Sequence, residues 1–312
     1  MAKYIIKRVA MGIFSIFIVA TVTFFVMNLV PGGPFVAEKS ISAAAQQALA
    51  EKYGLDKPLG VQYVNYMKSL LHGDLGLSLR QRGRTVNEII ASKLPVTLEL
   101  SLLAMIIALV FGISMGILAA VNKNSWVDHG ANFVAISGIS IPHFWLGILL
   151  ILVFSVNLQW LPASGYVPFS EDPLQNLRTL LLPASVLGTG LAATLMRHTR
   201  ASMIAVLKAD YIRTARAKGL LPKAVILKHA FRNALVPVIT LTTLLFGELL
   251  GGAVLTEQVF TIPGFGKMIV DSVFNRDYAV VQGVVLIVAI GFLMLNLLAD
   301  VLYVLINPKM RG

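Results

Sequence analysis

The chain has 312 residues, of which 57% are apolar and only 13% are charged. Soluble domains average about 25% charged residues, so too few polar side chains are present here to cover a hydrophobic core in water. A soluble enzyme is therefore excluded, and so is a disordered chain, which would be poor in apolar residues. The chain has no cysteine, which excludes disulfides and thiolate chemistry. Its net charge of +11 is typical of a membrane protein that retains Lys and Arg on the cytoplasmic side, and we expect no nucleic-acid partner.

Six apolar stretches predict six transmembrane helices, which makes the chain an all-α integral membrane protein. Five of them contain no Asp, Glu, Lys or Arg over at least 18 residues, and the sixth is interrupted only by Glu248. A helix of about 20 residues crosses the hydrocarbon core of a bilayer. The first stretch is longer than the apolar part of a signal peptide, so we expect an uncleaved helix. The predicted spans lie near residues 9–30, 97–121, 131–158, 179–197, 234–256 and 279–304.

The distribution of basic residues predicts the orientation of these spans. The short connections hold 15 Lys and Arg residues on one side of the membrane and 3 on the other. The positive-inside rule therefore places both termini in the cytoplasm, while the segment 31–96 is too long to follow the rule. The basic side comprises residues 1–8, 122–130, 197–233 and 305–312, and the other side comprises residues 159–178 and 257–278.

The long segment between the first two spans, residues 31–96, is predicted to be a folded extracytoplasmic cap. It opens with Pro-Gly-Gly-Pro at 31–34, a turn that cannot continue a helix. Residues 42–53 look helical, and residues 60–71 repeat apolar side chains at three- and four-residue spacing, as an amphipathic helix does. A loop at 72–76 follows. The predicted domains are the tail with the first span (1–30), the cap (31–96) and a core of five spans (97–312).

A second extramembrane segment, residues 197–232, carries nine Lys and Arg residues and one acid. Asp210 suits the N-cap of a short helix, and Gly219 suits the left-handed position just after its end. Pro222 suits the first turn of a second helix that runs to about residue 232. An ordinary positive-inside loop would be shorter and would lack these consecutive start and stop signals. The pattern favours a structured docking element for a cytoplasmic partner.

The motifs of common catalytic and metal sites are absent. Residues 263–268 resemble the end of a P-loop, but Thr261 and Met268 stand where that loop needs Gly and Ser or Thr, so we expect a turn and no ATP hydrolysis by this chain alone. No two of the five histidines have zinc-ligand spacing on one helix, and no metal site is expected. No nucleophile–base set or paired Asp is visible in the spans. The chain is predicted not to be an enzyme by itself.

Two polar residues within spans are candidate translocation-pathway residues. Glu248 would cost several kcal/mol if it were ionised in hydrocarbon, so it should face a cavity or a partner. It either attracts a substrate amine or is a protonated or hydrogen-bonded packing residue. His143 follows Pro142 and either lines a polar pathway or makes a hydrogen bond at a proline kink. The pairs Gly112/Gly116 and Gly247/Gly251 permit close helix approach.

The basic segment resembles the permease subunits of ATP-binding-cassette (ABC) importers, in the dipeptide/oligopeptide (peptide/nickel) branch. The similar string covers residues 211–220, with His229, residues 232–234 and Pro237. Other motifs of that branch follow in the same order over nearly the whole chain, which argues against chance similarity. They lie at residues 31–35, 53–58, 72–76, 255–257, 262–266, 276–278 and 307–309.

The resemblance implies a four-part importer core in the cytoplasmic (inner) membrane of a prokaryote. It would contain this permease, a related second permease and two ATPase subunits that bind ATP and Mg²⁺, whereas this chain would bind no cofactor. An extracytoplasmic binding protein would deliver di- or oligopeptides, which would cross by alternating access, and membrane lipid would surround the spans. The cap would help to receive the binding protein.

The resemblance also assigns the docking residues. In the broader importer family a Glu-Ala-Ala…Gly loop docks into a cleft on the ATPase. Aligned on Gly219, the Glu position is Arg213 here, so we expect Arg213 to meet an acidic or polar ATPase surface instead. The residues assigned to ATPase docking are Arg213, Thr214, Ala215, Arg216, Ala217, Lys218, Gly219 and Leu220.

Three alternatives stay open at this point. An ATP-independent secondary transporter or channel would need coupling residues within the spans, for which only Glu248 and Asp300 qualify. An intramembrane enzyme would need a catalytic constellation. Within the family, import of nickel chelates or other small solutes is an alternative because those permeases share the loop, although residues 31–35 favour oligopeptides.

Overall fold

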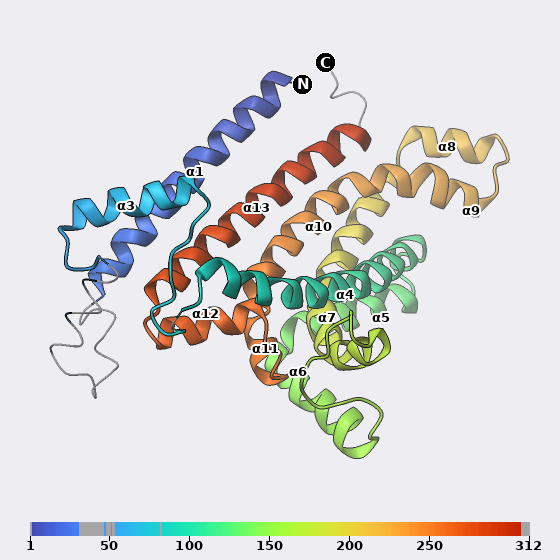
Figure 1. Cartoon of the computed structure of the whole chain (residues 1–312). Helices are drawn as coiled ribbons and strands as arrows, with labels where there is room; N and C mark the ends of the chain where they lie inside the picture. The colour runs from blue at the N-terminus through green and yellow to red at the C-terminus, as the bar shows by residue number, and fades with distance from the viewer. Residues whose placement is uncertain (1, 31–46, 48–50, 52–53, 82, 307–312) are drawn as a thin grey trace. The chain divides into compact units, whose positions relative to one another are not determined.

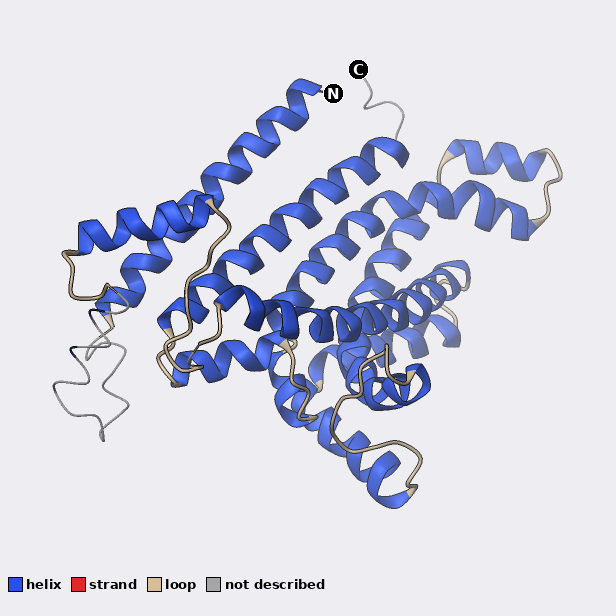
Figure 2. Ribbon diagram, viewed as in Figure 1, coloured by secondary structure: helices blue, strands red, loops and turns tan. Residues whose placement is uncertain are grey.

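The computed structural model describes residues 2–30, 47, 51, 54–81 and 83–306 (Figure 1). Within this part of the chain every regular element is a helix, and one isolated bridge pairs Leu77 with Thr85 (Figure 2). The prediction of an all-α protein is confirmed. The predicted turn at 31–34, most of the predicted helix at 42–53, the motif at 307–309 and the side chain of Asp300 lie outside the described residues.

The chain divides into two compact units. The large unit comprises residues 96–266 and the end of the chain from residue 292, and the small unit comprises residues 2–95 and 267–291. The division falls within two long helices, α4 (Val86–Val121) and α13 (Tyr278–Ile306). The first break follows Pro95, which lacks the N–H of a regular helical residue.

The large unit contains most of the helices. Besides the inner parts of α4 and α13 it comprises α5 (Trp126–Ser140), α6 (His143–Leu150), the π-helix η1 (Ile151–Asn157), α7 (Pro173–Leu207), α8 (Asp210–Ala217), α9 (Pro222–Ala224), the π-helix η2 (Val225–Phe231), α10 (Arg232–Gly252) and α11 (Val254–Val259). The small unit comprises α1 (Ala2–Leu29), α3 (Leu59–Leu71), the start of α4, nearly all of α12 (Phe265–Phe274) and the first half of α13.

Five helices are long and apolar enough to cross a membrane, and the number is six if one bent helix pair is counted as a single span. Each of these elements overlaps one of the six predicted spans. The third span was predicted as one helix, but it is broken: α5 and the helix that starts at His143 meet at an angle of 102°. Pro142 cannot donate a backbone hydrogen bond, and it forces Ile141 before it out of the helical region, to φ −77° and ψ 123°. The fifth span starts earlier than predicted, since α9, η2 and α10 run on without a break.

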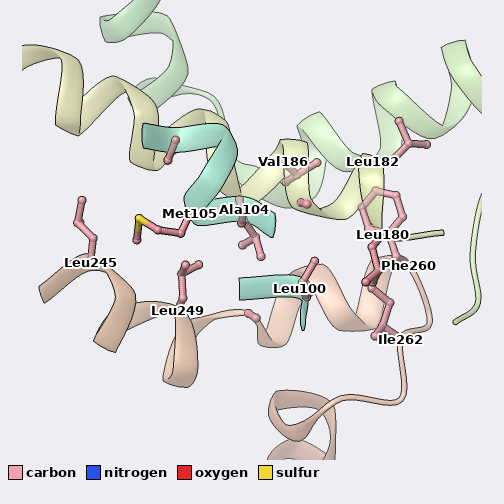
Figure 3. Close-up of a cluster of buried hydrophobic side chains, with 14 of the residues drawn as sticks. Leu100, Ala104, Met105, Leu180, Leu182, Val186, Leu245, Leu249, Phe260 and Ile262 are labelled. Atoms are coloured by element: carbon pink, nitrogen blue, oxygen red, sulfur yellow. The ribbon is translucent and has the colours of Figure 1, made fainter. Parts of the chain in front are cut away.

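The core of the large unit lies between α4, α7, α10 and the chain just after α11 (Figure 3). Leu100 and Ala104 of α4 are fully buried there, together with Leu195 of α7. Small residues let α4 and α7 approach closely, as predicted for Gly112 and Gly116. A Cβ atom on Gly112 would lie 2.7 Å from the carbonyl oxygen of Ala192, so only glycine fits.

In the small unit, α3 lies along α1 (Figure 1). The two helices pack through aromatic rings and one hydrogen bond. The rings of Phe24 and Tyr66 stack with centroids 5.4 Å apart, and the Tyr63 hydroxyl lies 2.9 Å from Oγ1 of Thr21. The predicted amphipathic helix at 60–71 is therefore confirmed as α3. The predicted loop at 72–76 follows it, with Gly73 and Gly76 at φ +73° and +90°.

A carboxylate distant in sequence fixes the next part of this unit. Asp277, which directly precedes α13, is 3% exposed. Its carboxylate accepts hydrogen bonds from the Ser78 hydroxyl and from the backbone N–H groups of Leu79 and Arg80. Arg80 Nε in turn donates to the carbonyl oxygen of Asn275 at 2.6 Å. Two segments almost 200 residues apart thus form one buried polar contact.

Candidate functional site

The docking element, defined here as α8 with the turn after it (residues 210–221), ends as the sequence predicts. Gly219 has φ +73°, the left-handed conformation that glycine adopts without steric cost. Its N–H donates to the carbonyl oxygen of Arg216 at 2.9 Å, and the N–H of Leu220 donates to that of Ala215 at 3.4 Å. These two bonds form a Schellman motif, which satisfies the carbonyl groups at the end of α8.

The start of α8 differs from the prediction. Ala209 occupies the N-cap position and makes no side-chain cap, whereas Asp210 is the first helical residue. The Asp210 carboxylate accepts a hydrogen bond from Arg213 one turn later. An acid in the first turn interacts favourably with the helix dipole, so Asp210 stabilises the start of α8 although it is not the N-cap residue.

One face of α8 anchors it to the large unit. Ile212 is fully buried and Ala215 is 7% exposed, in a cluster with Met203 of α7 and Ala234 of α10. The Asn233 side chain donates to the Tyr211 hydroxyl at 2.9 Å and to the carbonyl oxygen of His229 at 3.0 Å, which joins α8 to the start of α10. The docking element is therefore packed on two spanning helices rather than tethered to them.

The other face of the docking element is exposed and basic. Seven of the eight residues assigned to ATPase docking are exposed, and the eighth, Ala215, belongs to the anchoring face. This face also presents an apolar side chain next to the basic ones, because Leu221 is 75% exposed. The exposed residues are Arg213, Thr214, Arg216, Ala217, Lys218, Gly219 and Leu220.

An ion pair that sequence analysis did not find joins α5 to α7. Arg200 donates to both carboxylate oxygens of Asp128 at 2.6 Å, and Asp128 is 1% exposed. The N–H of Asn124 and the side chain of Asn132 donate to the same carboxylate. Both charged residues are visible in the sequence, but 72 residues separate them and the basic segment offers many other cations.

The two candidate pathway residues, Glu248 and His143, lie in different surroundings. Glu248 is exposed on α10, on the same face as Thr240 and Leu244, which are also exposed. Within the described residues no hydrogen bond or ion pair involves the Glu248 carboxylate. His143, in contrast, places Nδ1 3.3 Å from the carbonyl oxygen of Val186 and its ring against Gly190, which fits a hydrogen-bonded histidine at the Pro142 break.

Two further carboxylates organise polar contacts in the large unit, and the sequence analysis assigned neither of them a role. Glu99 accepts hydrogen bonds from the Tyr166 hydroxyl and the Asn176 side chain, each at 2.9 Å. The Tyr166 pKa is raised to about 12, first by burial and then by this bond. Glu257 is fully buried and accepts a hydrogen bond from Thr97. Among the residues described, no cluster of His, Asp and Glu could hold a metal ion.

Comparison with known proteins gives two family matches. Residues 112–312 match the family described as binding-protein-dependent transport system inner membrane component, and residues 1–101 match the N-terminal part of such membrane components. The oligopeptide transport system permease protein AppB of Bacillus subtilis is 42% identical over the full length of both chains. The glutathione transport system permease protein GsiC of Escherichia coli (strain K12) is 44% identical over 100% of this chain and 99% of its own.

Two solved structures share the fold. An inward-facing methionine ABC transporter, MetNI, superimposes with a TM-score of 0.59 at 16% identity, over 70% of this chain and 96% of that one. An amino acid ABC transporter crystallised with histidines gives a TM-score of 0.51 at 15% identity, over 70% and 94% of the two chains. At these identities the likeness concerns the fold alone.

Proposed function

Because the chain belongs to the family of binding-protein-dependent transport system inner membrane components, the multi-pass permease subunits of ABC importers, we propose that it moves di- and oligopeptides into the cytoplasm. An extracytoplasmic binding protein delivers the peptide. A second, related permease completes the pathway, and two separate ATPase subunits bind ATP and Mg²⁺ and supply the energy. The names of the relatives, which include oligopeptide and glutathione transport, support a peptide substrate.

The observation that carries this proposal is the anchored docking element. Its exposed face offers Arg213, Arg216 and Lys218 to a cytoplasmic partner. Its buried face packs on α7 and α10, so a force applied to the element reaches both spanning helices. A rigid connection of this kind is what a mechanical link between nucleotide-driven closure and alternating access requires, because a flexible loop would absorb the movement.

In the proposed cycle, ATP binding closes the two ATPases and draws the docking elements of the two permeases together. The spans then open outward, accept the peptide from the binding protein and return after hydrolysis. Within this cycle Ala215 acts from the anchoring side, and the seven exposed residues form the contact. Basic side chains at this contact favour an acidic or polar surface on the ATPase.

Glu248 is the proposed pathway residue for a peptide amine. Its exposure within this chain leaves the carboxylate available to a substrate or to the second permease. The variant Glu248→Gln keeps the shape and removes the charge, so uptake of peptides with a free amine should fall relative to peptides with a blocked terminus. If the ratio of free-amine to blocked-peptide uptake were the same in the wild type and the variant, a pathway role for Glu248 would be contradicted. For His143 the proposed role is to position α6 against α7 at the pathway.

The whole assignment is tested by what accompanies the chain in its native membrane. A tagged chain extracted in mild detergent should bring with it an ATPase pair and a second permease, and vesicles rebuilt from the assembly should accumulate peptide only with ATP. Recovery of the chain alone, together with uptake driven by a proton gradient without nucleotide, would replace the ABC mechanism by secondary transport.

A further inference from the structure

The small unit contains a pocket of about 250 Å³ that none of the roles described above uses. Its walls come from the end of α1, from α3, from the loop after α3 and from the first turns of α13. The loop wall is held in place by Asn87, whose side chain accepts from the N–H of Leu75 at 3.0 Å and donates to the carbonyl oxygen of Gly73 at 2.7 Å. The pocket is therefore preformed.

Two of the tyrosines that line this pocket have hydroxyls without a hydrogen-bond partner among the described residues. The hydroxyl oxygens of Tyr66 and Tyr278 are both buried and unpartnered, and Tyr278 as a whole is 8% exposed. Burial of an unpaired hydroxyl is unfavourable, and such groups in native proteins usually meet a ligand or ordered water. Tyr63, one turn earlier on α3, shows the satisfied alternative, since its hydroxyl pairs with Thr21 and it does not line the pocket.

The charged and aromatic side chains that line the pocket indicate what kind of group it binds. Among the described residues that line it, Asp74 is the only charged one, and no basic side chain is present. The stacked rings of Phe24 and Tyr66 form an aromatic wall beside it. Burial and the neighbouring Tyr63 raise the pKa of Tyr66 to about 12, above the ordinary tyrosine value, so the hydroxyl does not compete with Asp74 as an anion. An ammonium group on an aliphatic stem suits this set, because it donates three hydrogen bonds, is attracted to a carboxylate and packs against aromatic faces.

The positions of the polar lining residues indicate from which side the ammonium group enters the pocket. Five of the polar lining residues belong to α3 and the loop after it, outside the spans: Gln62, Asn65, Tyr66, Ser69 and Asp74. Only three come from the ends of the spanning helices, namely Asn28, Tyr278 and Gln282. An occupant that arrives from the extracytoplasmic water therefore meets more of the polar groups than a lipid embedded in the bilayer would.

We propose that this pocket receives a lysine side chain that the extracytoplasmic binding protein presents to the permease. The proposal rests on the function proposed above. The ammonium group lies between Asp74 and the hydroxyls of Tyr66 and Tyr278, and its methylene stem packs on Phe24. The pocket thereby helps to select and orient the binding protein before the peptide is released.

The test measures the affinity of the purified binding protein for the purified importer, with the full chain in lipid nanodiscs. Tyr278→Phe and Tyr66→Phe each remove one oxygen atom and should weaken binding about fivefold, and Asp74→Asn should weaken it about tenfold. The matched controls Tyr63→Phe, which loses a paired hydroxyl outside the pocket, and Asp56→Asn, an exposed acid before α3, should leave affinity unchanged. Unchanged thermal unfolding of the two pocket Tyr→Phe variants checks that they are folded.

A double-mutant cycle then identifies the lysine. One Lys→Gln change on the binding protein should weaken binding by itself and have little further effect on the Asp74→Asn importer. If both pocket Tyr→Phe variants bind normally, the hydroxyls are merely hydrated and the proposal is wrong. If affinity follows the content of phosphatidylethanolamine instead of any lysine, the occupant is a lipid and the proposal is also wrong. Failure of the wild-type importer to bind any extracytoplasmic protein would contradict the proposed function itself, which is a separate result.

Discussion

The docking element and the small unit are both held by buried side chains and hydrogen bonds, but over very different separations in the chain. The Schellman bonds of the docking element join residues three and five positions apart, from Gly219 to Arg216 and from Leu220 to Ala215. In the small unit, the Ser78–Asp277 bond spans 199 positions. A local element can form as soon as its own residues are present, whereas the small unit requires both ends of the chain to meet. Variants in the two regions should therefore fail in different ways.

The largest effect is expected at the long-range contact. Asp277→Ala leaves the Ser78 hydroxyl and two backbone N–H groups without their acceptor in a buried site, so the free energy of unfolding in detergent should fall by about 3 kcal/mol or more. Asp271→Ala, which removes an exposed carboxylate on α12, is the control and should change little. Equal unfolding transitions for the two variants would mean that the Asp277 contact does not hold the small unit together.

A second buried pair should behave similarly within the large unit. Arg200→Ala leaves Asp128 buried without its cation, and loss of one partner of a buried ion pair costs about 3 kcal/mol. Arg197→Ala, three residues earlier on the same helix and exposed, should shift the unfolding free energy by less than about 0.5 kcal/mol. If both substitutions lowered the free energy of unfolding equally, the loss of positive charge from the segment, and not the loss of the Arg200–Asp128 pair, would explain the effect.

The anchor of the docking element should give a smaller and local effect. Ile212→Ala removes a fully buried side chain and should cost about 2 kcal/mol of local stability. Cleavage by protease within residues 208–222 should increase, and less ATPase should co-purify, although every exposed docking residue is unchanged. Leu227→Ala, at a side chain that is 47% exposed, is the control. Normal ATPase recovery with Ile212→Ala would show that docking does not need a rigid anchor.

The smallest effect is expected at the turn. A Cβ atom on Gly219 would have no neighbour within 4 Å, so a substitution there is strained by its positive φ and not by a clash. Gly219→Val should cost about 1–2 kcal/mol in the turn and weaken ATPase binding, while Gly219→Asn should be milder because Asn tolerates the left-handed conformation. ATPase affinity measured with both variants provides the comparison. If Asn and Val weaken it equally, the size of the side chain rather than the backbone conformation is what matters.

Local features were predictable because their causes are local. The apolar stretches predicted the spans, the Gly and Pro positions predicted that a short helix ends before Gly219 and that a helix begins at Pro222, and the spacing of apolar residues predicted α3. Two predictions were less accurate. Pro142 was recognised as a kink, but the third span was predicted as one helix and the angle at the break is 102°; Asp210 proved to be the first helical residue rather than the cap.

The partners of the charged and polar residues were not predictable from the sequence. Asp128, Glu257 and Asp277 are each nearly or fully buried, and each has its partner in a distant part of the chain. One sequence shows which residues carry charge, but not which of many opposite charges or hydroxyls will lie within 3 Å. The pocket with Tyr66 and Tyr278 is a further case, because nothing in the sequence distinguishes their hydroxyls from the paired hydroxyl of Tyr63.

The sequence by itself predicted an all-helical membrane protein with both ends in the cytoplasm and a basic element between the fourth and fifth spans. Those properties follow from hydropathy, from charge asymmetry and from the conformational limits of Gly and Pro, all of which act within about 20 residues. Only the tertiary structure decided which face of α8 is buried, which carboxylates are paired and where a polar pocket forms. These depend on helix packing, which brings together side chains whose separation in the chain carries no information about their separation in space.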